Sequence, residues 1–310
     1  MERGSPAPVL IDTDPGIDDA LALLLAWGSP ELRVEAVTTV AGNVTLDDAT
    51  LNVYRLAELR APRPAPRIGR GAARPLARRL RTATRYHGKD GLGDVAGWEL
   101  RDLRAVFDAG PEKAVDLILE TARRFGPDLV LLALGPLTNL ALALAADRDA
   151  LTRVGRLVAM GGAVDVRGNV TAETEFNVQC DPEAAGVVLG AGLRLDLVPL
   201  NATRQATLMR HELEAALARC PGPVASRIGD FTRRAFRSDA AAMHLHDPLA
   251  VAAAIDPALV VWQAARLEVT AAGATRRVEG PPNCRIATRV DRARLLALLL
   301  PRLCPRPAPC

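Results

Sequence analysis

Four carboxylates fall within eight residues near the start of the chain, between Asp12 and Asp19, and they limit the folds that the chain can adopt. A short apolar segment, Val9 to Ile11, precedes them, and an alanine- and leucine-rich segment, Ala20 to Ala26, follows. The first segment is typical of a buried strand and the second of a buried helix. Because charge is costly to bury at such a junction, we expect a functional site there.

Carboxylates this close together repel one another, so a site that keeps them ionised needs a cation. Oxygen ligands suit a hard divalent ion. Calcium, which accepts about six to eight oxygens, is favoured over magnesium, which usually keeps several waters. Pro15 and Gly16 turn the chain sharply, so Asp14 and Asp19 can converge at the end of the strand.

A purely structural interpretation is the alternative for these acidic residues. Asp12 could cap the turn, and Asp18 and Asp19 could simply begin a helix. This explains each residue singly, but it explains all four beside Pro-Gly poorly. The block resembles the N-terminal signature of the inosine-uridine preferring nucleoside hydrolases, Asp-x-Asp-Pro-Gly-x-Asp-Asp, and the match is complete.

Strand-like and helix-like segments alternate along the chain. Strands are predicted over 32–40, 67–69, 128–134 and 157–160, and helices over 46–59, 112–125 and 138–146. Continuous apolar strands between helices indicate an α/β fold, with a mainly parallel central sheet covered by helices and a Rossmann-like core. We expect a single nucleoside hydrolase-like domain over 1–310, with a more helical excursion over 209–237 and loose tails at 1–8 and 301–310.

Candidate site residues follow several of these strands. Asp14, Asn43, Leu134 and Met160 each stand at or just after the end of a predicted strand, where ligands of parallel sheets bind.

Three further motifs carry polar side chains. Their residues are Leu-Gly-Pro-Leu-Thr-Asn at 134–139, Asn169, Glu175 and Asn177 in the block 168–182, and His-Asp-Pro at 246–248. Amides and carboxylates of this kind suit hydrogen bonds to sugar hydroxyls. A solvated loop and a helix cap are the plain alternatives for the last two motifs. All three nevertheless resemble motifs of the same family, so the resemblance extends from about residue 9 to 255.

The resemblance implies a role for each candidate. Calcium would be bound by Asp14, Asp19, the Leu134 carbonyl and Asp247, and Asp14 would also accept the proton of the attacking water. The sugar would be held by Asp18 and Asn177 at the 2′ hydroxyl, by Asp247 at the 3′ hydroxyl and by Asn169 and Glu175 at the 5′ hydroxyl. Asn43 would support the metal and sugar end, Met160 would line the substrate pocket, and Asp12 would support the site from behind.

The implied reaction is hydrolysis of the N-glycosidic bond of a ribonucleoside. Anionic groups beneath the sugar would favour its positively charged transition state. His246 and His87 are the candidates for protonating the departing base, because an ordinary imidazole pKa suits proton transfer near neutral pH. Family members usually carry aromatic residues before His-Asp-Pro that close over the base, but residues 230–237 contain no tyrosine. The base preference therefore stays open.

Two other functions compete with this hypothesis. A haloacid-dehalogenase-like phosphohydrolase also places Asp-x-Asp after its first strand, but it needs a small hydroxyl residue soon afterwards and a lysine for phosphate. Pro15 and Gly16 stand there instead, and of the two lysines only Lys113 is near a helix start. A catalytically silent protein that binds nucleosides or ribose is the second alternative, although Asp14 and His246 are both present.

Composition bears on partners and location. A net charge of +3 and an aromatic content of 3% argue against nucleic-acid binding, and apolar runs such as 129–134 are too short to span a membrane. Residues 1–8 lack the apolar core of a signal peptide, and five cysteines without a C-x-x-C pair favour a reducing compartment. We expect a cytoplasmic protein with a small-molecule substrate, and the resemblance implies a homodimer or homotetramer. His211 and His244 are expected at the surface.

Overall fold

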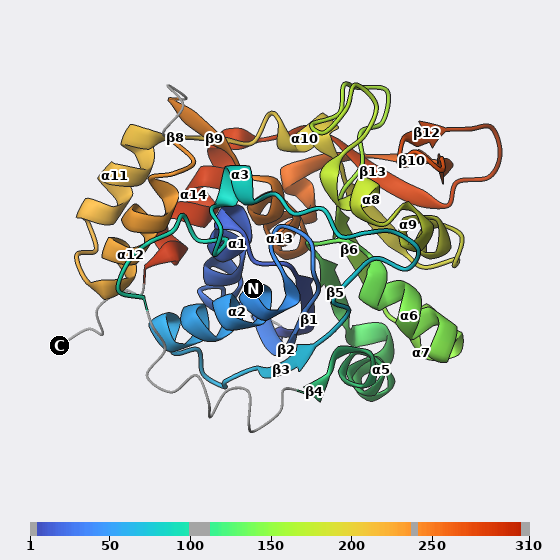
Figure 1. The fold of residues 1–310 in the computed structure, drawn as a ribbon, viewed down its shortest axis with the longest axis horizontal. Coiled ribbons are helices and arrows are strands. Elements are labelled where there is room, and N and C mark those ends of the chain that lie inside the picture. The colour runs from blue at the N-terminus through green and yellow to red at the C-terminus, as the bar shows by residue number, and fades with distance from the viewer. Residues whose placement is uncertain (1–4, 99–111, 237–240, 305–310) are drawn as a thin grey trace.

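A computed structural model describes residues 5–98, 112–236 and 241–304 (Figure 1). Nine of the strands in this part of the chain form one sheet, in the order β10-β13-β7-β6-β5-β1-β2-β3-β4. These strands are β1 (Ala7–Thr13), β2 (Leu32–Thr39), β3 (Arg67–Arg70), β4 (Glu112–Lys113), β5 (Val130–Ala133), β6 (Arg156–Met160), β7 (Leu195–Val198), β10 (Val260–Ala265) and β13 (Cys284–Val290). Two small sheets pair β8 (Thr207–Met209) with β9 (Ala242–His244) and β11 (Leu267–Val269) with β12 (Thr275–Arg277).

The helices cover both faces of the large sheet. They are α1 (Ile17–Trp27), α2 (Leu46–Arg60), α3 (Thr84–His87), α5 (Ala114–Phe125), α6 (Thr138–Ala146), α7 (Arg148–Thr152), α8 (Phe176–Cys180), α9 (Pro182–Leu189), α10 (Leu200–Thr203), α11 (Arg210–Ala218), α12 (Pro223–Thr232), α13 (His246–Ile255) and α14 (Arg292–Leu303), with short 3-10 helices at Gly126–Asp128 and Pro257–Leu259. One hydrophobic core lies under α1, α13 and α14 and a second under α5, α6 and α9 (Figure 1).

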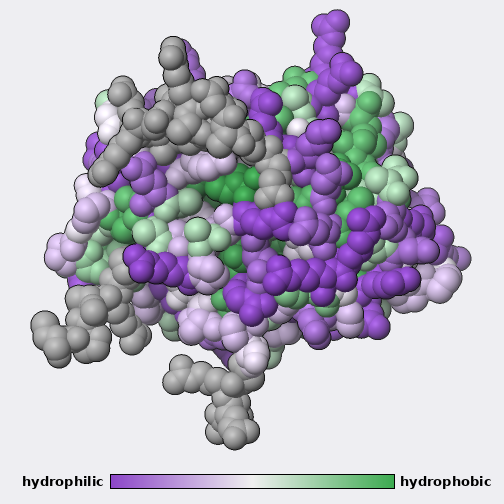
Figure 2. Space-filling view, turned by 90° about the horizontal axis from the view of Figure 1, so that it is seen from below, coloured by the Kyte–Doolittle hydropathy of each residue, from purple (hydrophilic) through white to green (hydrophobic). Residues whose placement is uncertain are grey.

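The strand directions confirm the predicted mainly parallel α/β fold. β1 pairs in parallel with both β2 and β5, and only the β10–β13 pair in the large sheet is antiparallel, among the strands that the structure describes. On the face seen in Figure 2, hydrophilic side chains cover much of the surface, with smaller apolar areas between them. The apolar faces of the helices are therefore turned toward the sheet.

The centre of the sheet follows directly from its apolar residues. Val9, Leu10 and Ile11 of β1 are fully buried, because neighbouring strands flank them and helices cover both faces. After its first turn, which contains Asp18 and Asp19, helix α1 is apolar on all sides and is buried almost completely, as a helix packed inside a protein should be. Asp12 in β1, Asp14 after it, and Asp18 and Asp19 in α1 are consequently held in the interior.

Some sequence expectations need correction. Residues 112–113, expected to begin a helix, form β4, and the helix begins at Ala114. The tails are shorter than expected, because residues 7–8 belong to β1 and residues 301–303 to α14. Each is held by its neighbours in the sheet or the core, and residues 1–4 and 305–310 lie outside the described residues. The predicted helical excursion is formed by α11 and α12.

The cysteines depart from the expectation of reduced thiols. Cys220, near the end of α11, forms a disulfide with Cys304, just after α14. No local spacing in the sequence indicates this pair, because 84 residues separate the two cysteines. Cys180 and Cys284 are free and buried, and Cys310 lies outside the described residues. None of the described helices combines the length and apolar character needed to cross a bilayer.

Candidate functional site

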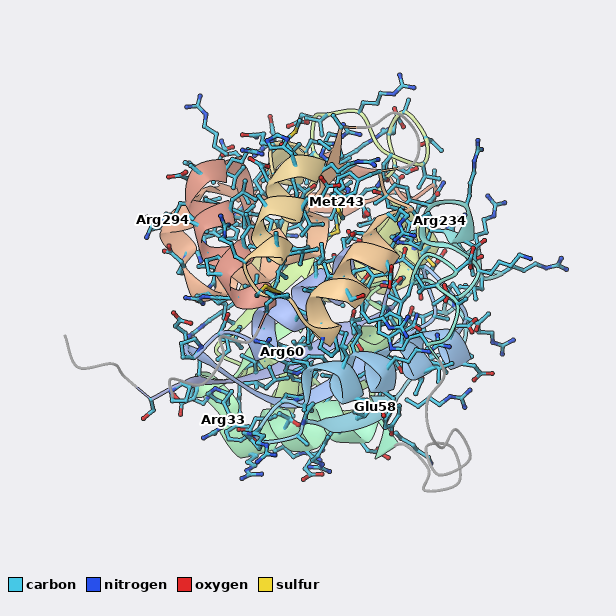
Figure 3. The ribbon with its side chains drawn as sticks, turned by 90° about the vertical axis from the view of Figure 1, so that its left-hand side faces the viewer. Arg33, Glu58, Arg60, Arg234, Met243 and Arg294 are labelled. Atoms are coloured by element: carbon cyan, nitrogen blue, oxygen red, sulfur yellow. A yellow bond between two sulfur atoms is a disulfide. The ribbon has the colours of Figure 1, made fainter. Side chains whose placement is uncertain are left out.

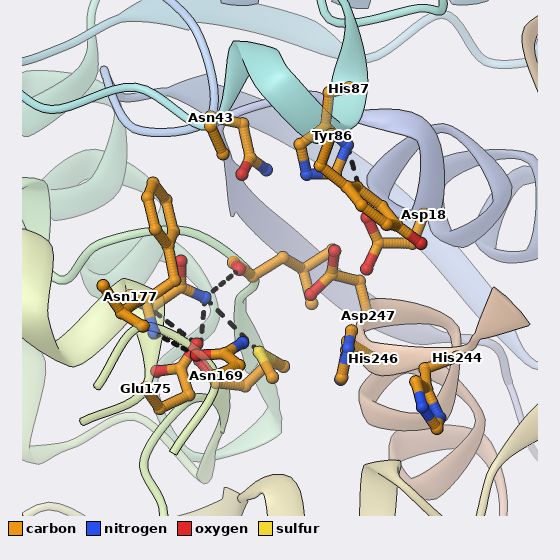
Figure 4. Close-up of a pocket in the computed structure, with 15 residues that line it drawn as sticks. Asp18, Asn43, Tyr86, His87, Asn169, Glu175, Asn177, His244, His246 and Asp247 are labelled. Atoms are coloured by element: carbon orange, nitrogen blue, oxygen red, sulfur yellow. Dashed lines mark hydrogen bonds and ion pairs between the residues drawn. The ribbon is translucent and has the colours of Figure 1, made fainter. Parts of the chain in front are cut away.

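A cavity of about 330 Å³ opens beyond the carboxyl ends of the central strands (Figure 4). Its walls contain ten of the twelve residues predicted from the sequence to act in catalysis, metal binding or substrate binding, namely Asp18, Asn43, His87, Leu134, Met160, Asn169, Glu175, Asn177, His246 and Asp247. Asp14 and Asp19, the remaining two, do not line the cavity and are fully buried. Segments far apart in the chain thus meet at one place, although their roles stay predictions.

Asp14 directly follows β1 and its carboxylate is held from two sides. Its Oδ2 accepts a hydrogen bond from the backbone N–H of Asn43 at 2.6 Å, while its Oδ1 has no hydrogen-bond partner. A Cβ added to Gly42 would lie 2.1 Å from Oδ2, and one added to Gly135 would lie 2.5 Å from Oδ1. Both contacts are too short for a real side chain, so the two glycines make room for this carboxylate.

Asp19 is fixed at the start of α1. Its Oδ1 accepts the hydroxyl of Thr13 at 2.5 Å, and its Oδ2 accepts the N–H of Gly16 at 2.9 Å and the amide of Asn43 at 3.1 Å. The last contact links the loop after β2 to the first turn of α1. Asn43 therefore contacts both Asp14 and Asp19, and its role at the metal and sugar end of the site stays a prediction.

Three carboxylates approach one another closely. One oxygen from each of Asp18, Asp19 and Asp247 lies within 4.8 Å of the others. The sequence prediction placed Asp14 with Asp19 and Asp247 instead, and Asp14 is not part of this close group. Asp247 nevertheless resembles Asp14 in having a buried carboxylate oxygen, Oδ1, without a hydrogen-bond partner.

The acidic cluster is electrostatically unfavourable when no cation is bound. Burial, followed by repulsion from Asp19, raises the pKa of Asp14 well above its usual range and that of Asp18 to about 7. Burial and the charges of Asp19, Asp18 and Asp14 likewise raise the pKa of Asp247. Buried oxygens without partners and mutually repelling carboxylates are the donor set of a hard divalent cation. The cluster can therefore hold a metal ion.

The Leu134 carbonyl, predicted as a metal ligand, lies at the cavity wall and accepts the side-chain amide of Asn177 at 2.7 Å. The same amide donates to the Met160 carbonyl at 3.2 Å. These contacts orient the Asn177 side chain between the ends of β5 and β6, and Figure 4 shows it pointing into the cavity. Because a carbonyl has two lone pairs, Leu134 can still bind a second partner.

Glu175 and Asn169 form the opposite end of the cavity. The Glu175 carboxylate caps α8 by accepting the N–H groups of Asn177 at 3.0 Å and Val178 at 3.2 Å, and it also accepts that of Gly162 at 2.9 Å. Burial raises its pKa despite these hydrogen bonds. Asn169 accepts the N–H of Phe176 through its Oδ1, so its amide N–H₂ group is the part available to a ligand.

The two histidines differ from the sequence argument in their charge. Burial is the largest effect and lowers the pKa of both His87 and His246 to about 3, so both rings are neutral near pH 7. His87 Nδ1 accepts the N–H of Ile17 at 3.0 Å, which places the ring proton on Nε2. His246 Nδ1 shares a hydrogen bond of 2.8 Å with the hydroxyl of Thr203. His87 can therefore offer its Nε2 proton to a departing base, and His246 can do the same in the tautomer in which its Nδ1 accepts the hydroxyl of Thr203.

Asp12 lies behind the cluster, as predicted. Its Oδ1 accepts the hydroxyl of Thr38 at 2.6 Å and the amide of Asn139 at 2.7 Å, while its Oδ2 has no partner. Burial raises its pKa to about 7. Asn139 also donates to the carbonyl of Thr39 at 2.9 Å, so Asp12 helps to join β1, β2 and α6.

Sequence reasoning missed several cavity residues. Tyr86, Phe176 and His244 line the cavity together with Ala83 and Val170. His244 is exposed as expected, but its position beside His246 was not foreseen, and their rings lie 5.6 Å apart. His211 is exposed too. The available signal was adjacency, because Tyr86, Phe176 and His244 each stand within two residues of a predicted site residue.

Comparisons of the sequence and of the fold with known proteins both find nucleoside hydrolases. The profile of the family described as inosine-uridine preferring nucleoside hydrolase matches residues 9–297. A pyrimidine-specific ribonucleoside hydrolase, RihA, from Shewanella sp. (strain MR-7) is 39% identical over 259 residues, which cover 81% of this chain and 79% of the relative. Uridine nucleosidase 1 of Arabidopsis thaliana is 36% identical over 277 residues, covering 87% of this chain and 80% of the relative.

A solved structure gives the same result. The plant nucleoside hydrolase PpNRh1 superposes with a TM-score of 0.88 at 32% identity, covering 97% of this chain and 100% of that one. The match spans both the central sheet and the segments that line the cavity.

Proposed function

Because this chain belongs to the inosine-uridine preferring nucleoside hydrolase family, we propose that it hydrolyses the N-glycosidic bond of ribonucleosides with the help of calcium. The products are ribose and the free base. The observation that carries the proposal is the pair of buried, unpartnered carboxylate oxygens, one on Asp14 and one on Asp247, beneath a cavity whose walls carry hydrogen-bonding groups. Membership makes the chain an enzyme of the nucleoside hydrolase class and excludes the phosphohydrolase alternative.

Different residues of the site take part in proton transfer and in binding of the sugar. A bound calcium ion would lower the pKa of the attacking water and help to fix the sugar. Asp14, whose Oδ1 forms no hydrogen bond in the structure, accepts the proton of that water. Asp18, Asn177 and Asp247 bind the 2′ and 3′ hydroxyls. The negative charge of Asp18 and Asp247 also favours the positively charged sugar of the transition state.

The far end of the sugar and the base are handled by other residues. Asn169 and Glu175 bind the 5′ hydroxyl. His87 and His246, both neutral near pH 7, stabilise the departing base by hydrogen bonds from their ring N–H groups. This replaces the proton transfer that ordinary imidazole pKa values suggested, because burial disfavours the charged imidazolium. Water attacks the anomeric carbon from the side of Asp14, and the base leaves from the opposite side and then takes a proton from solvent, so the configuration at that carbon is inverted.

The experiment that tests the proposal measures release of free ribose from uridine, cytidine, inosine and adenosine by purified protein, with calcium and with a chelator. We expect chelator-sensitive release that calcium restores. Uridine is the first substrate to test, because the relatives in Shewanella and Arabidopsis are named for pyrimidine nucleosides and uridine. Calcium binding without release from any nucleoside would favour the silent binding protein.

Calcium affinity should depend on the glycine that faces Asp14. Gly135→Ala places a methyl group against Asp14 Oδ1, so we expect it to weaken calcium binding by about 10- to 100-fold. Titration calorimetry on metal-free protein measures the effect. Gly186→Ala is the matched control, because no atom lies within 4 Å of the added Cβ there, and it should bind calcium like the wild type. Equal affinities of both variants would argue against a metal at Asp14.

Location and assembly complete the proposal. We propose a cytoplasmic homodimer or homotetramer that acts on small-molecule ribonucleosides and binds neither nucleic acid nor membrane, in keeping with the net charge of +3 and the few aromatic residues. The disulfide between Cys220 and Cys304 tests the location, because disulfides persist in oxidising compartments. A cytoplasmic location predicts that alkylation of protein taken from cells without reductant modifies both cysteines, whereas the disulfide seen in the structure predicts that neither is modified. Sedimentation velocity measures the assembly.

A further inference from the structure

The base end of the cavity lacks the aromatic closure that the family resemblance leads one to expect before His-Asp-Pro. Phe231 and Phe236 are the aromatic residues of the segment 230–237, and they are 0% and 4% exposed because both pack in the hydrophobic core. Residues 238–243 contain no aromatic residue at all. The segment that begins with α12 therefore cannot supply a ring that covers the base.

Tyr86 offers such a ring from a different part of the chain. It belongs to α3, lines the cavity and is 47% exposed, so part of the side chain is accessible to a ligand. Its ring lies 4.8 Å from that of His87 and almost perpendicular to it. Figure 4 shows Tyr86 near Asp18 and across the cavity from Asn169 and Glu175, which is the end where a base would lie.

Helix α12 and the turn after it pack against α3, which carries Tyr86, and against the loop that follows α3. Arg227, Phe231 and Arg234 are spaced by four and three residues, so they share one face of the helix and of the turn that follows it. Arg227 donates to the Gly97 carbonyl at 2.6 Å, and its guanidinium lies 5.4 Å from the Trp98 ring. Phe231 stacks on Trp98, with ring centres 6.0 Å apart.

Arg234, which is labelled in Figure 3, binds the backbone of Tyr86 directly. Its guanidinium donates to the carbonyls of Tyr86 at 3.1 Å, Arg85 at 3.1 Å and Thr84 at 3.4 Å. It also pairs with the carboxylate of Asp94 at 3.1 Å. One side chain thus binds three successive carbonyls at the end of α3 and an acidic residue of the loop that follows.

We propose that Tyr86 closes over the base of the substrate, and that Arg234 acts as the positioning residue that holds Tyr86 and His87 at the cavity. This inference rests on the proposed function, because it assigns the base end of the same site. Stacking on an aromatic ring tolerates any planar base, so Tyr86 supplies affinity for the base without selecting one. In this proposal, the segment after α11 does not contact the base itself and instead holds α3 in position through Arg234.

The first test compares Tyr86→Ala and Tyr86→Phe with the wild type in ribose release from uridine. Loss of the ring should raise KM by about tenfold and change kcat by less than about threefold, because stacking favours binding of the base before the chemical step. Phenylalanine keeps the ring and should preserve KM within about twofold. A Tyr86→Ala variant with the wild-type KM would overturn the proposal.

The second test asks whether Arg234 acts through Tyr86. Arg234→Ala should raise KM in the wild-type background and leave it nearly unchanged in the Tyr86→Ala background, while kcat falls in both because His87 also shifts. Arg234→Lys should recover part of the KM effect. Arg233→Ala is the matched control, since its side chain is 64% exposed and pairs only with Asp230 among the described residues. An equal rise in KM in both backgrounds would overturn the coupling.

A binding measurement separates this inference from the proposed hydrolysis. Calorimetric titration with uridine and with ribose, in calcium, should show weaker uridine binding by Tyr86→Ala and equal ribose binding. If the wild type binds uridine but releases no ribose, the proposed function fails and the titration still decides the role of Tyr86. If the wild type binds no nucleoside, both proposals fall.

Discussion

Asp14→Asn should lower kcat for ribose release by about 10²- to 10⁴-fold, because the variant lacks the group that accepts the proton of the attacking water. The amide is nearly the same size as the carboxylate, so it still fits between Gly42 and Gly135 and its oxygen can accept the N–H of Asn43. The NH₂ group then points where a cation should bind. We therefore expect weaker calcium affinity as well.

The same variant should remain folded, which distinguishes a catalytic loss from unfolding. Burial and the charges of Asp19 and Asp18 make the Asp14 carboxylate unfavourable in metal-free protein, and a neutral amide removes that repulsion. The Tm of metal-free Asp14→Asn should equal or exceed that of the metal-free wild type. Asp149→Asn, an exposed substitution in α7, is the control and should keep kcat within about twofold. An Asp14→Asn enzyme with more than a tenth of wild-type kcat would refute the role of Asp14.

In the absence of calcium, the free energy of unfolding should fall as the pH rises from 5 to 8. Burial raises the pKa of Asp12 and Asp18 to about 7 and that of Asp14 and Asp247 above the usual range, whereas an unfolded aspartate has a pKa of about 4. The folded state therefore binds protons more tightly. Its extra stability is complete below about pH 4 and is lost as the pH rises toward the folded pKa values.

Calorimetry of metal-free and calcium-saturated protein at several pH values measures this effect. In metal-free protein we expect Tm to fall by on the order of 10 °C between pH 5 and 8. Bound calcium favours the ionised carboxylates, so the fall should disappear in calcium. Hydrogen bonds from arginines lower the pKa values of surface carboxylates such as Glu120 and Asp147. These groups therefore change the stability only at more acidic pH, outside the range from 5 to 8. A metal-free Tm that stays constant over this range would contradict the cluster's role.

Much of the fold could be predicted because local patterns were consistent with it. A short apolar run such as Val9 to Ile11, between turn formers, is typical of a buried strand in a sheet covered on both faces, and the observed parallel pairing of β1 confirms this interpretation. Short elements are harder to predict from the sequence, and the two residues of β4 match the pattern of a helix start. A strand of that length has no period of its own and exists only because β3 is beside it.

For the site, too, local motifs predict which residues take part but not the surroundings of their side chains. Residue identity and order were enough to name Asp14, Asn43, Asn177 and Asp247, because each stands in a motif beside a strand or helix end. The environment of each side chain was not available. Histidine charge is the clearest case, since the pKa of His87 falls to about 3 because distant segments exclude water from it and because Arg234, distant in the sequence, places a positive charge nearby.

The sequence by itself determined the α/β class, the acidic cluster and the polar residues of the cavity, because these depend on residue types and on spacing within single segments. Only the tertiary structure decided which carboxylates meet, how burial shifts their pKa values and which ring lies at the base end. Tyr86 and Arg234 illustrate the reason: they are 148 residues apart, and their contact depends on how α12 packs against the loop after α3. Distances between such segments are set by the packing of the whole core, which no local pattern encodes.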